Sequence, residues 1–180
     1  RGHAADSRRG FRKTAFAGKA TGSVKLLFRR FRPEFTDGVI DLVPIRLFPP
    51  EEEMGFGEVY DYIIAPHGQR REAGRISLRL GESPCVYYFG HIGYHVDPPW
   101  RGHHYAARAC ALLEPLIAAS GKSSIVITTD PDNMPSRHTC ERIGCILESI
   151  VPVPPLMQSR WELSPVKCRY VWKINTRMDL

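Results

Sequence analysis

The sequence lacks any hydrophobic run long enough to cross a membrane. Across its 180 residues, no segment approaches the roughly 18 consecutive apolar residues of a transmembrane helix. The first residues also lack the apolar core of a secretory signal. These absences predict a cytoplasmic protein with no membrane partner. The length is that of a single domain and is sufficient to bury a sizeable core.

The cysteines follow no metal-binding or disulfide pattern. Their number is odd, and no two have the CxxC spacing of a zinc site or redox motif. The histidine motifs His103-His104 and His138-x-Cys140 also lack a second ligand pair at matching spacing, so we predict no metal. We expect free, mostly buried thiols in a reducing compartment. The five cysteines are Cys85, Cys110, Cys140, Cys145 and Cys168.

Acidic residues are almost absent from the N-terminal end. Residues 1–32 hold ten of the 25 Lys and Arg residues but only one of the 19 acidic residues, so this segment accounts for the net charge of +6. Residues 1–23 show no periodicity, and we interpret them as a disordered basic tail before a single domain over 24–180. Because the predicted folded body is slightly acidic, we do not expect nucleic acid as a partner. Binding of nucleic acid through residues 1–32 remains the alternative.

Residue patterns predict a series of strands. Segments 59–65 and 72–80 are separated by a turn signal and predict an antiparallel hairpin. Segment 124–129 is apolar on both faces, which is typical of a buried, parallel strand. The predicted strands are 40–48, 59–65, 72–80, 87–96, 124–129, 145–153 and 167–174.

Two segments have helical features. Apolar residues recur at helical spacing over 102–119, where Pro115 predicts a kink or an early end to the regular helix. Residues 134–143 form a shorter predicted helix with Pro135 in its first turn and Gly144 after it. Residues 154–165 are rich in proline and are predicted to be irregular.

This element order predicts an α/β fold with a mixed, mostly antiparallel central sheet. Residues 87–129 supply a strand–helix–strand unit, in which the two strands are parallel. The first N–H groups of its helix have no partner within the helix, so the loop before it suits an anion, typically phosphate. Gly102 and Ala106 allow close approach of a ligand to the backbone there.

The loop and the shorter helix together resemble a known family. Arg101-Gly102-His103-His104-Tyr105-Ala106 resembles the Arg/Gln-x-x-Gly-x-Gly/Ala loop of the GCN5-related N-acetyltransferases (the GNAT superfamily). Asn133-Met134-Pro135-Ser136 and Glu141-Arg142-Ile143-Gly144-Cys145 resemble its Asn-x-x-Ser…Glu-Lys-x-Gly-Phe segment. The likeness covers about residues 58–150. Within the family, the sequence resembles a bacterial subgroup of unassigned substrate. It implies a GNAT-like domain with a β-α-β acyl-CoA-binding core.

The resemblance implies an enzyme that transfers an acetyl group directly from acetyl-CoA, as cosubstrate, to a primary amine. The amine would belong to a small molecule, a peptide or a protein. Monomer and homodimer both remain open. The resemblance implies that these residues bind the cofactor: Tyr94, His95 and Val96 beside the pantetheine, Arg101, Gly102, His103, His104, Tyr105 and Ala106 around the pyrophosphate, and Asn133 and Ser136 on the opposite side.

The chemistry needs a base for the amine and an acid for the departing thiolate. His91 stands where family members often carry a carboxylate base, and an ordinary histidine titrates near neutral pH. His95 is a second candidate, and Glu58, Asp61 and Glu72 are candidates that act through water. Many relatives use a tyrosine of the second helix as the acid; that segment has no tyrosine here, and Ser136 is the candidate.

One residue departs from the family pattern. His104 stands where the loop normally has its central glycine. If that position requires a positive φ, histidine is strained there at a cost of about 1 kcal/mol or more. This departure and the missing tyrosine support an alternative function, a non-catalytic acyl-CoA-binding sensor on the same fold.

Overall fold

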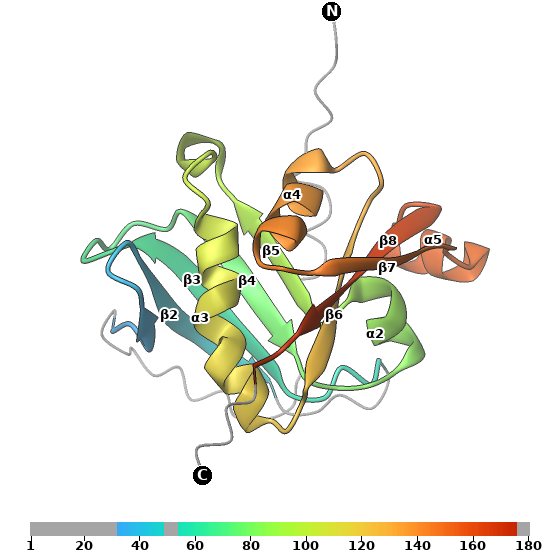
Figure 1. Ribbon diagram of the computed structural model, residues 1–180, viewed down its shortest axis with the longest axis horizontal. Helices are drawn as coiled ribbons and strands as arrows, with labels where there is room; N and C mark the ends of the chain where they lie inside the picture. Colours follow the sequence, from blue (N-terminus) through green and yellow to red (C-terminus); the bar gives the residue numbers. More distant parts are fainter. Residues whose placement is uncertain (1–31, 49–53, 176–180) are drawn as a thin grey trace, which may run out of the picture.

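The computed structural model describes residues 32–48 and 54–175, and these form a sheet flanked by helices (Figure 1). The predicted tail 1–23 lies outside the described residues. The strands are β1 (Phe35–Thr36), β2 (Ile40–Phe48), β3 (Val59–Pro66), β4 (Gly74–Arg79), β5 (Ile92–Val96), β6 (Ser124–Thr129), β7 (Ile146–Pro152) and β8 (Val166–Lys173). The helices are α2 (Pro84–Phe89), the short 3-10 helix η1 (Pro98–Trp100), α3 (Tyr105–Ala119), α4 (Met134–Arg142) and α5 (Pro155–Trp161).

The sheet is mixed and mostly antiparallel, which confirms the predicted fold class. Among the described residues it has eight strands in the order β1-β2-β3-β4-β5-β6-β8-β7. Only β5 and β6 run parallel, and α3 connects them as predicted. The predicted hairpin is also confirmed, because β3 pairs with β4 in antiparallel register from Val59 opposite Arg79 to Ile64 opposite Gly74.

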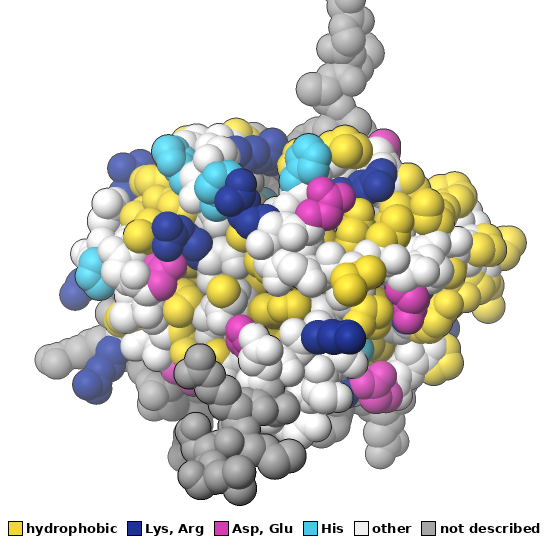
Figure 2. All heavy atoms as spheres, viewed as in Figure 1, with side chains coloured by type: hydrophobic (Ala, Val, Ile, Leu, Met, Phe, Trp, Pro, Cys, Tyr) yellow, Lys and Arg dark blue, Asp and Glu magenta, His cyan; other side chains and the backbone are white. Residues whose placement is uncertain are grey.

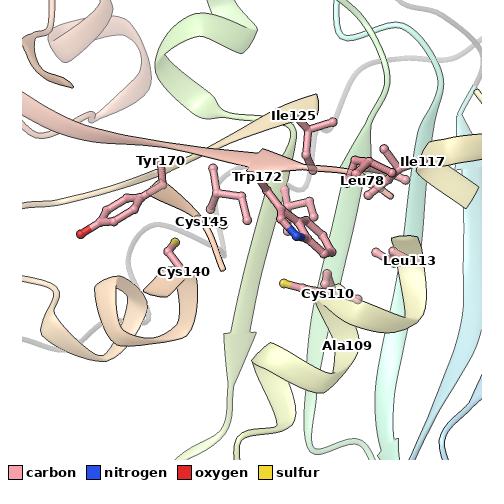
Figure 3. Packing of buried hydrophobic residues seen from close by; sticks show 14 of the residues in the cluster. Leu78, Ala109, Cys110, Leu113, Ile117, Ile125, Cys140, Cys145, Tyr170 and Trp172 are labelled. Atoms are coloured by element: carbon pink, nitrogen blue, oxygen red, sulfur yellow. The ribbon is translucent and has the colours of Figure 1, made fainter. Parts of the chain in front are cut away.

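The helices cover the two faces of the sheet. Buried residues of α3 pack against residues of β4, β6 and β8 in one hydrophobic cluster, which α4 also joins (Figure 3). In β8, Tyr170 and Trp172 belong to this cluster, whereas Arg169 lies on the opposite face and places its guanidinium 3.6 Å from the Tyr87 ring of α2. Trp161 of α5 contacts Phe89 of α2. The sheet therefore has an α3 face and an α2 face.

The strand predicted over 87–96 is wrong in its first half, where the chain forms α2. The Ser83 side chain accepts a hydrogen bond from Val86 N–H, and Pro84 occupies the first helical turn, so the helix has a strong start. It ends at Gly90, whose φ is 73°, and a Cβ there would lie 2.8 Å from the backbone nitrogen of Thr128. The aromatic residues between these signals resemble a strand in composition only.

Two other predicted boundaries are also corrected. Residues 155–161, predicted to be irregular, form α5 with proline in the first turn. The helix predicted from residue 102 begins at Tyr105, and it continues past Pro115 to Ala119 without an early end. Both Pro115 and Ala111, whose helical hydrogen bond the proline removes, are exposed to water.

None of the helices in residues 32–48 and 54–175 is long and apolar enough to span a membrane. Within the same residues, no group of three or more His, Cys, Asp and Glu side chains is placed to hold a metal ion.

Candidate functional site

The strands β5 and β6 diverge immediately after they meet. Their register consists of a single pair, Ile92 with Ile127. Asp97 N–H donates at 2.8 Å to Ala73 O, directly before β4, and so points toward β4. Along an antiparallel strand, the backbone groups of successive residues point to alternate sides. The N–H and C=O groups of Tyr94 and Val96 therefore point toward β6, where no described strand reaches them. We call the space between residues 93–96 and 128–129 the fork.

His91 closes the narrow end of the fork. It is 4% exposed, its N–H donates to Val126 O at 2.7 Å, and its Nδ1 accepts from Val126 N–H at 3.0 Å. The ring proton therefore lies on Nε2, which is 3.2 Å from Glu82 Oε1. Burial lowers the pKa of His91, and the nearby Glu82 carboxylate opposes this. Both ring nitrogens of His91, the predicted base, thus have hydrogen-bond partners. Its two bonds to Val126 connect the start of β5 to β6.

The loop that follows β5 turns into α3 through two residues of positive φ. Gly102 has a φ of 84° and His104 a φ of 59°. Apart from its chain neighbours, no atom of the described residues lies within 4 Å of the position that a Cβ of Gly102 would take, so the backbone is open to a ligand. The side chain of His104 makes no capping bond to α3. The first N–H groups of the helix are therefore not capped by this residue and suit an anion.

The other loop residues surround this helix start. Arg101 Nε donates to Val96 O at 3.0 Å, which ties the loop to the end of β5. The rings of Trp100 and Tyr105 stack 6.1 Å apart, and His103 lies against Tyr105. Ala106, 9% exposed, is in the first turn of α3. Figure 2 shows His, Lys and Arg side chains gathered at the end of the molecule where α3 and α4 begin.

Tyr94 connects β5 to the start of α4. Its hydroxyl lies 2.9 Å from Ser136 Oγ, and the Asn133 side chain accepts a hydrogen bond from Ser136 N–H at 3.2 Å. Burial raises the pKa of Tyr94 well above its usual range, so the phenol keeps its proton. The helix α4 has no tyrosine of its own, but the structure brings a tyrosine from β5 to it. His95, by contrast, lies on the α2 face with Nε2 at 2.8 Å from Asp97 Oδ1.

A groove of about 390 Å³ begins beside the loop, between α3, the end of α4 and β8. Arg108 in this groove pairs with Asp37 at 2.7 Å, and the Glu114 side chain accepts a hydrogen bond from Asn175 N–H. Its lining residues are His104, Ala107, Arg108, Ala111, Glu114, Arg142, Ile143, Trp172 and Asn175.

The α2 face of the sheet carries a second group of polar side chains. Of the three carboxylates considered as bases, Glu58 is bonded to the Tyr60 hydroxyl and Glu72 to Arg75, both at the surface. Asp61 instead accepts a hydrogen bond from Ser77, one strand away. Ser77 and Arg79 were not singled out in the sequence. Alternation within 72–80 places both on one face, but only the strand register sets them beside Asp61.

Comparison with known proteins identifies the family. A family model described as an acetyltransferase (GNAT) domain matches residues 26–146. This range exceeds half of the chain, and the chain therefore belongs to the GNAT acetyltransferase family, as its motifs predicted. No curated protein sequence matches the chain significantly.

Several solved structures have the same fold. The microcin C7 self-immunity acetyltransferase MccE, solved with acetyl-CoA and AMP, is 22% identical, with a TM-score of 0.50 over 64% of this chain and 61% of that one. The ribosomal-protein-S5-alanine acetyltransferase from Vibrio fischeri is 15% identical, with a TM-score of 0.51 over 65% and 62%. RimJ of Mycobacterium smegmatis, solved with CoA-disulfide, is 18% identical, with a TM-score of 0.51 over 67% and 56%. The chain thus spans about three-fifths of these proteins, and the likeness shows the fold alone.

Proposed function

We propose that the chain is an N-acetyltransferase that passes an acetyl group directly from acetyl-CoA to a primary amine. The observation that carries this proposal is the fork. The edge of β5 that no described strand pairs beyond Ile92 leads into a loop whose last residue, His104, does not cap the helix N-terminus. A ligand with an amide-rich arm and a pyrophosphate matches that sequence of groups, since the arm pairs with a strand edge and the phosphates accept from helix N–H groups.

The residues at the fork have distinct roles in this proposal. Tyr94 offers its backbone N–H and C=O, and Val96 its N–H, to the pantetheine arm, and residues 101–106 bind the pyrophosphate. The groove beside His104 gives the adenosine end a place to extend. His91 acts as a positioning residue, because its bonds to Val126 fix the point at which the two strands separate.

The departing thiolate leaves beside Tyr94 and Ser136. A protonated phenol that also contacts a hydroxyl can donate a hydrogen bond to the sulfur as negative charge develops there. The Tyr94–Ser136 pair thus supplies a hydrogen-bond donor for the sulfur, where the sequence assigned the acid to Ser136 alone. This arrangement replaces the tyrosine missing from α4.

Binding is tested first by calorimetry with acetyl-CoA on the full chain. His103→Glu places a negative charge in the exposed loop, and we expect it to weaken acetyl-CoA binding at least tenfold through repulsion of the phosphates. His138→Glu makes the same change at an exposed position of α4, away from the helix start, and should alter binding less than threefold. Equal losses in both variants would remove the loop from the proposal.

Turnover is tested by release of free CoA in the presence of a library of amines. Release that depends on both an amine and acetyl-CoA supports the transferase. The alternative function, an acyl-CoA sensor, is favoured by the positive φ of His104 in place of the usual glycine. Tight acetyl-CoA binding without turnover on any amine would establish the sensor and reject the enzyme.

A further inference from the structure

A row of residues crosses three strands on the α2 face beside the fork. Asp61 of β3 is the register partner of Ser77 of β4, and Ser77 is the partner of Gly93 of β5. The Ser77 hydroxyl donates a hydrogen bond to the Asp61 carboxylate. Gly93 is the first residue beyond the pair that closes the fork. A group bound over Ser77 is therefore about one strand spacing, roughly 5 Å, from Gly93 and from the narrow end of the fork.

Arg79 lies two residues after Ser77 in β4, on the same face, and retains unused hydrogen-bond donors. Its guanidinium stands 3.4 Å from the position that a Cβ of Gly93 would take. Within the described residues it donates a single long hydrogen bond, 3.4 Å to Gly90 O, and no ion pair includes it. Burial lowers the pKa of Arg79 from its usual value. A guanidinium has five N–H donors in one plane, so most of those of Arg79 are available to an anion.

Asp61 and Arg79 carry opposite charges that are not paired with each other in the described residues. They are diagonal neighbours on one face, because Arg79 pairs with Val59, two residues before Asp61. Such neighbours have Cα atoms about 7–8 Å apart. In the part of the chain that the structure describes, the two side chains attract each other but form no salt bridge. An ammonium group at Ser77 and Asp61 and a carboxylate at Arg79 would pair both charges.

Three aromatic side chains, Phe56, Phe89 and Trp161, form an aromatic wall beside Arg79. The Arg79 guanidinium lies 5.2 Å from the centre of the Phe56 ring. Phe56 contacts Phe89 edge to face at 5.6 Å, and Phe89 contacts Trp161 at 6.1 Å. These rings are partly exposed. An apolar or aromatic group attached between the ammonium and the carboxylate would pack on this wall.

We propose that the acceptor is a free α-amino acid with an apolar or aromatic side chain, bound on the α2 face. The inference rests on the proposed acetyl transfer and names the acceptor class for it. Arg79 binds the carboxylate, Ser77 is a catalytic residue that contacts the amine, and Asp61 is a positioning residue that acts through Ser77.

The proton path follows from the hydrogen bond between Ser77 and Asp61. The bound ammonium first loses one proton through Ser77 Oγ to the Asp61 carboxylate, which passes it to water. The neutral amine that remains donates its lone pair to the acetyl carbonyl carbon, and the C–N bond forms as the C=O π pair moves to oxygen. The nitrogen then gives a second proton to Ser77 Oγ, whose own proton moves to the Asp61 carboxylate and from there to water. As the C=O bond re-forms, the C–S bonding pair goes to sulfur, which accepts a hydrogen bond at the Tyr94–Ser136 pair and takes its proton from water. The products are the N-acetyl amino acid and free CoA.

The acceptor class is tested with L-phenylalanine, phenylalanine amide and 2-phenylethylamine, which share one ring and one primary amine. We expect kcat/KM for phenylalanine to exceed that of the two others about 10- to 100-fold, because only phenylalanine has a carboxylate for Arg79. Arg79→Gln should remove this preference by raising the KM for phenylalanine alone. Arg75→Gln, the same change two residues away on the same face, should preserve it.

The proton path is tested with Asp61→Asn and Ser77→Ala. Each should lower kcat about 10²- to 10⁴-fold while acetyl-CoA affinity stays within threefold of wild type. Because the two residues act as one path, the double variant should be no slower than the slower single variant. Glu58→Gln, a neutralised carboxylate at the surface of the same region, should leave kcat unchanged. Additive losses, or a parallel loss of acetyl-CoA affinity, would overturn the assigned path.

Failure of the two proposals can be distinguished. Turnover on all three amines at similar rates retains the acetyltransferase and overturns the amino-acid acceptor. If no amine is acetylated, calorimetry with phenylalanine and CoA decides. Binding that Arg79→Gln abolishes supports the site and rejects the enzyme, and absence of binding overturns the site.

Discussion

The two faces of β3, β4 and β5 differ at successive residues of the same strands. On the α3 face, Tyr62, Leu78 and Ile92 are at most 1% exposed and belong to the core. On the α2 face, Asp61 and Ser77, next to them in sequence, are polar and partly exposed. Alternation lets a single hydrogen-bonded ladder present apolar side chains to the core on one face and polar side chains on the other. Stability and chemistry should therefore respond to separate sets of substitutions.

The largest effect is expected from Leu78→Ala on the α3 face. Leu78 is fully buried, and its truncation leaves a cavity that should cost about 2–5 kcal/mol of unfolding free energy, measured by urea denaturation. Ser77→Ala, one residue earlier, should cost about 1 kcal/mol or less. Similar losses in both variants would show that the two faces do not divide their roles in this way.

The next effect is a loss of stability in mild acid, caused by His91. Its pKa in the folded protein is below the ordinary 6.5, so between those values the unfolded chain binds more protons. The contribution is complete above pH 6.5 and is lost as the pH falls below it, by up to about 1.4 kcal/mol per pH unit. Glu82 and Lys122 are the charged groups that face the ring, and the lowered pKa of Glu82 adds a loss at more acidic pH.

This pH dependence is checked with His91→Gln in urea denaturation between pH 4.5 and 8. The variant should be less stable than wild type at pH 8, because Val126 N–H loses its partner. It should also lack the slope just below pH 6.5. A wild-type slope that persists in the variant would assign the titration to another group.

A smaller effect is expected from Tyr94→Phe, which removes the hydrogen bond between β5 and Ser136 of α4. The loss should be about 1 kcal/mol, because the Tyr94 hydroxyl is largely buried. Tyr60→Phe removes a hydroxyl that bonds Glu58 at the surface and should cost less than about 0.5 kcal/mol. Thermal unfolding of both variants measures the difference, and equal shifts would contradict the burial argument.

The smallest effect is expected from His104→Gly in the loop between β5 and α3. Glycine adopts the observed φ of 59° without strain, so the variant should gain up to about 1 kcal/mol of stability. His103→Gly, at a neighbouring position without a positive φ, should give no gain. If His104→Gly destabilises the protein, the imidazole makes a contribution that exceeds its backbone strain.

The sequence predicts the parts of this molecule that depend on local signals. The β3–β4 hairpin follows from alternation, and the loop before α3 follows from its small residues and the helix after it. The helix α2 was missed because Tyr87, Tyr88 and Phe89 have strand composition, while the cap at Ser83 and Pro84 decided the outcome. The helix α3 continues past Pro115 without the early end, because the carbonyl of Ala111 that the proline leaves without a helical partner is exposed to water.

The candidate site was predictable to a different extent on its two sides. Ser136 contacts Tyr94 of β5 and Asn133, whereas the binding of a cofactor by these residues and by the loop stays a prediction. The engagement of His91 depends on Val126, which is 35 residues away, and no local pattern indicates it. The placement of Asp61 beside Ser77 likewise depends on strand register. Long-range pairing, rather than residue type, therefore limits what the sequence reveals.

The single register pair between β5 and β6 has a consequence for the dynamics of the sheet. The amides of Tyr94 and Val96 lack a strand partner, so their hydrogens should exchange with solvent far faster than those of the neighbouring β4. An arm bound in the fork would take the place of the missing rungs and slow this exchange. The bound arm would then extend the hydrogen-bonded ladder between β5 and β6. Without it, strands β1–β5 and strands β6–β8 are joined by one register pair.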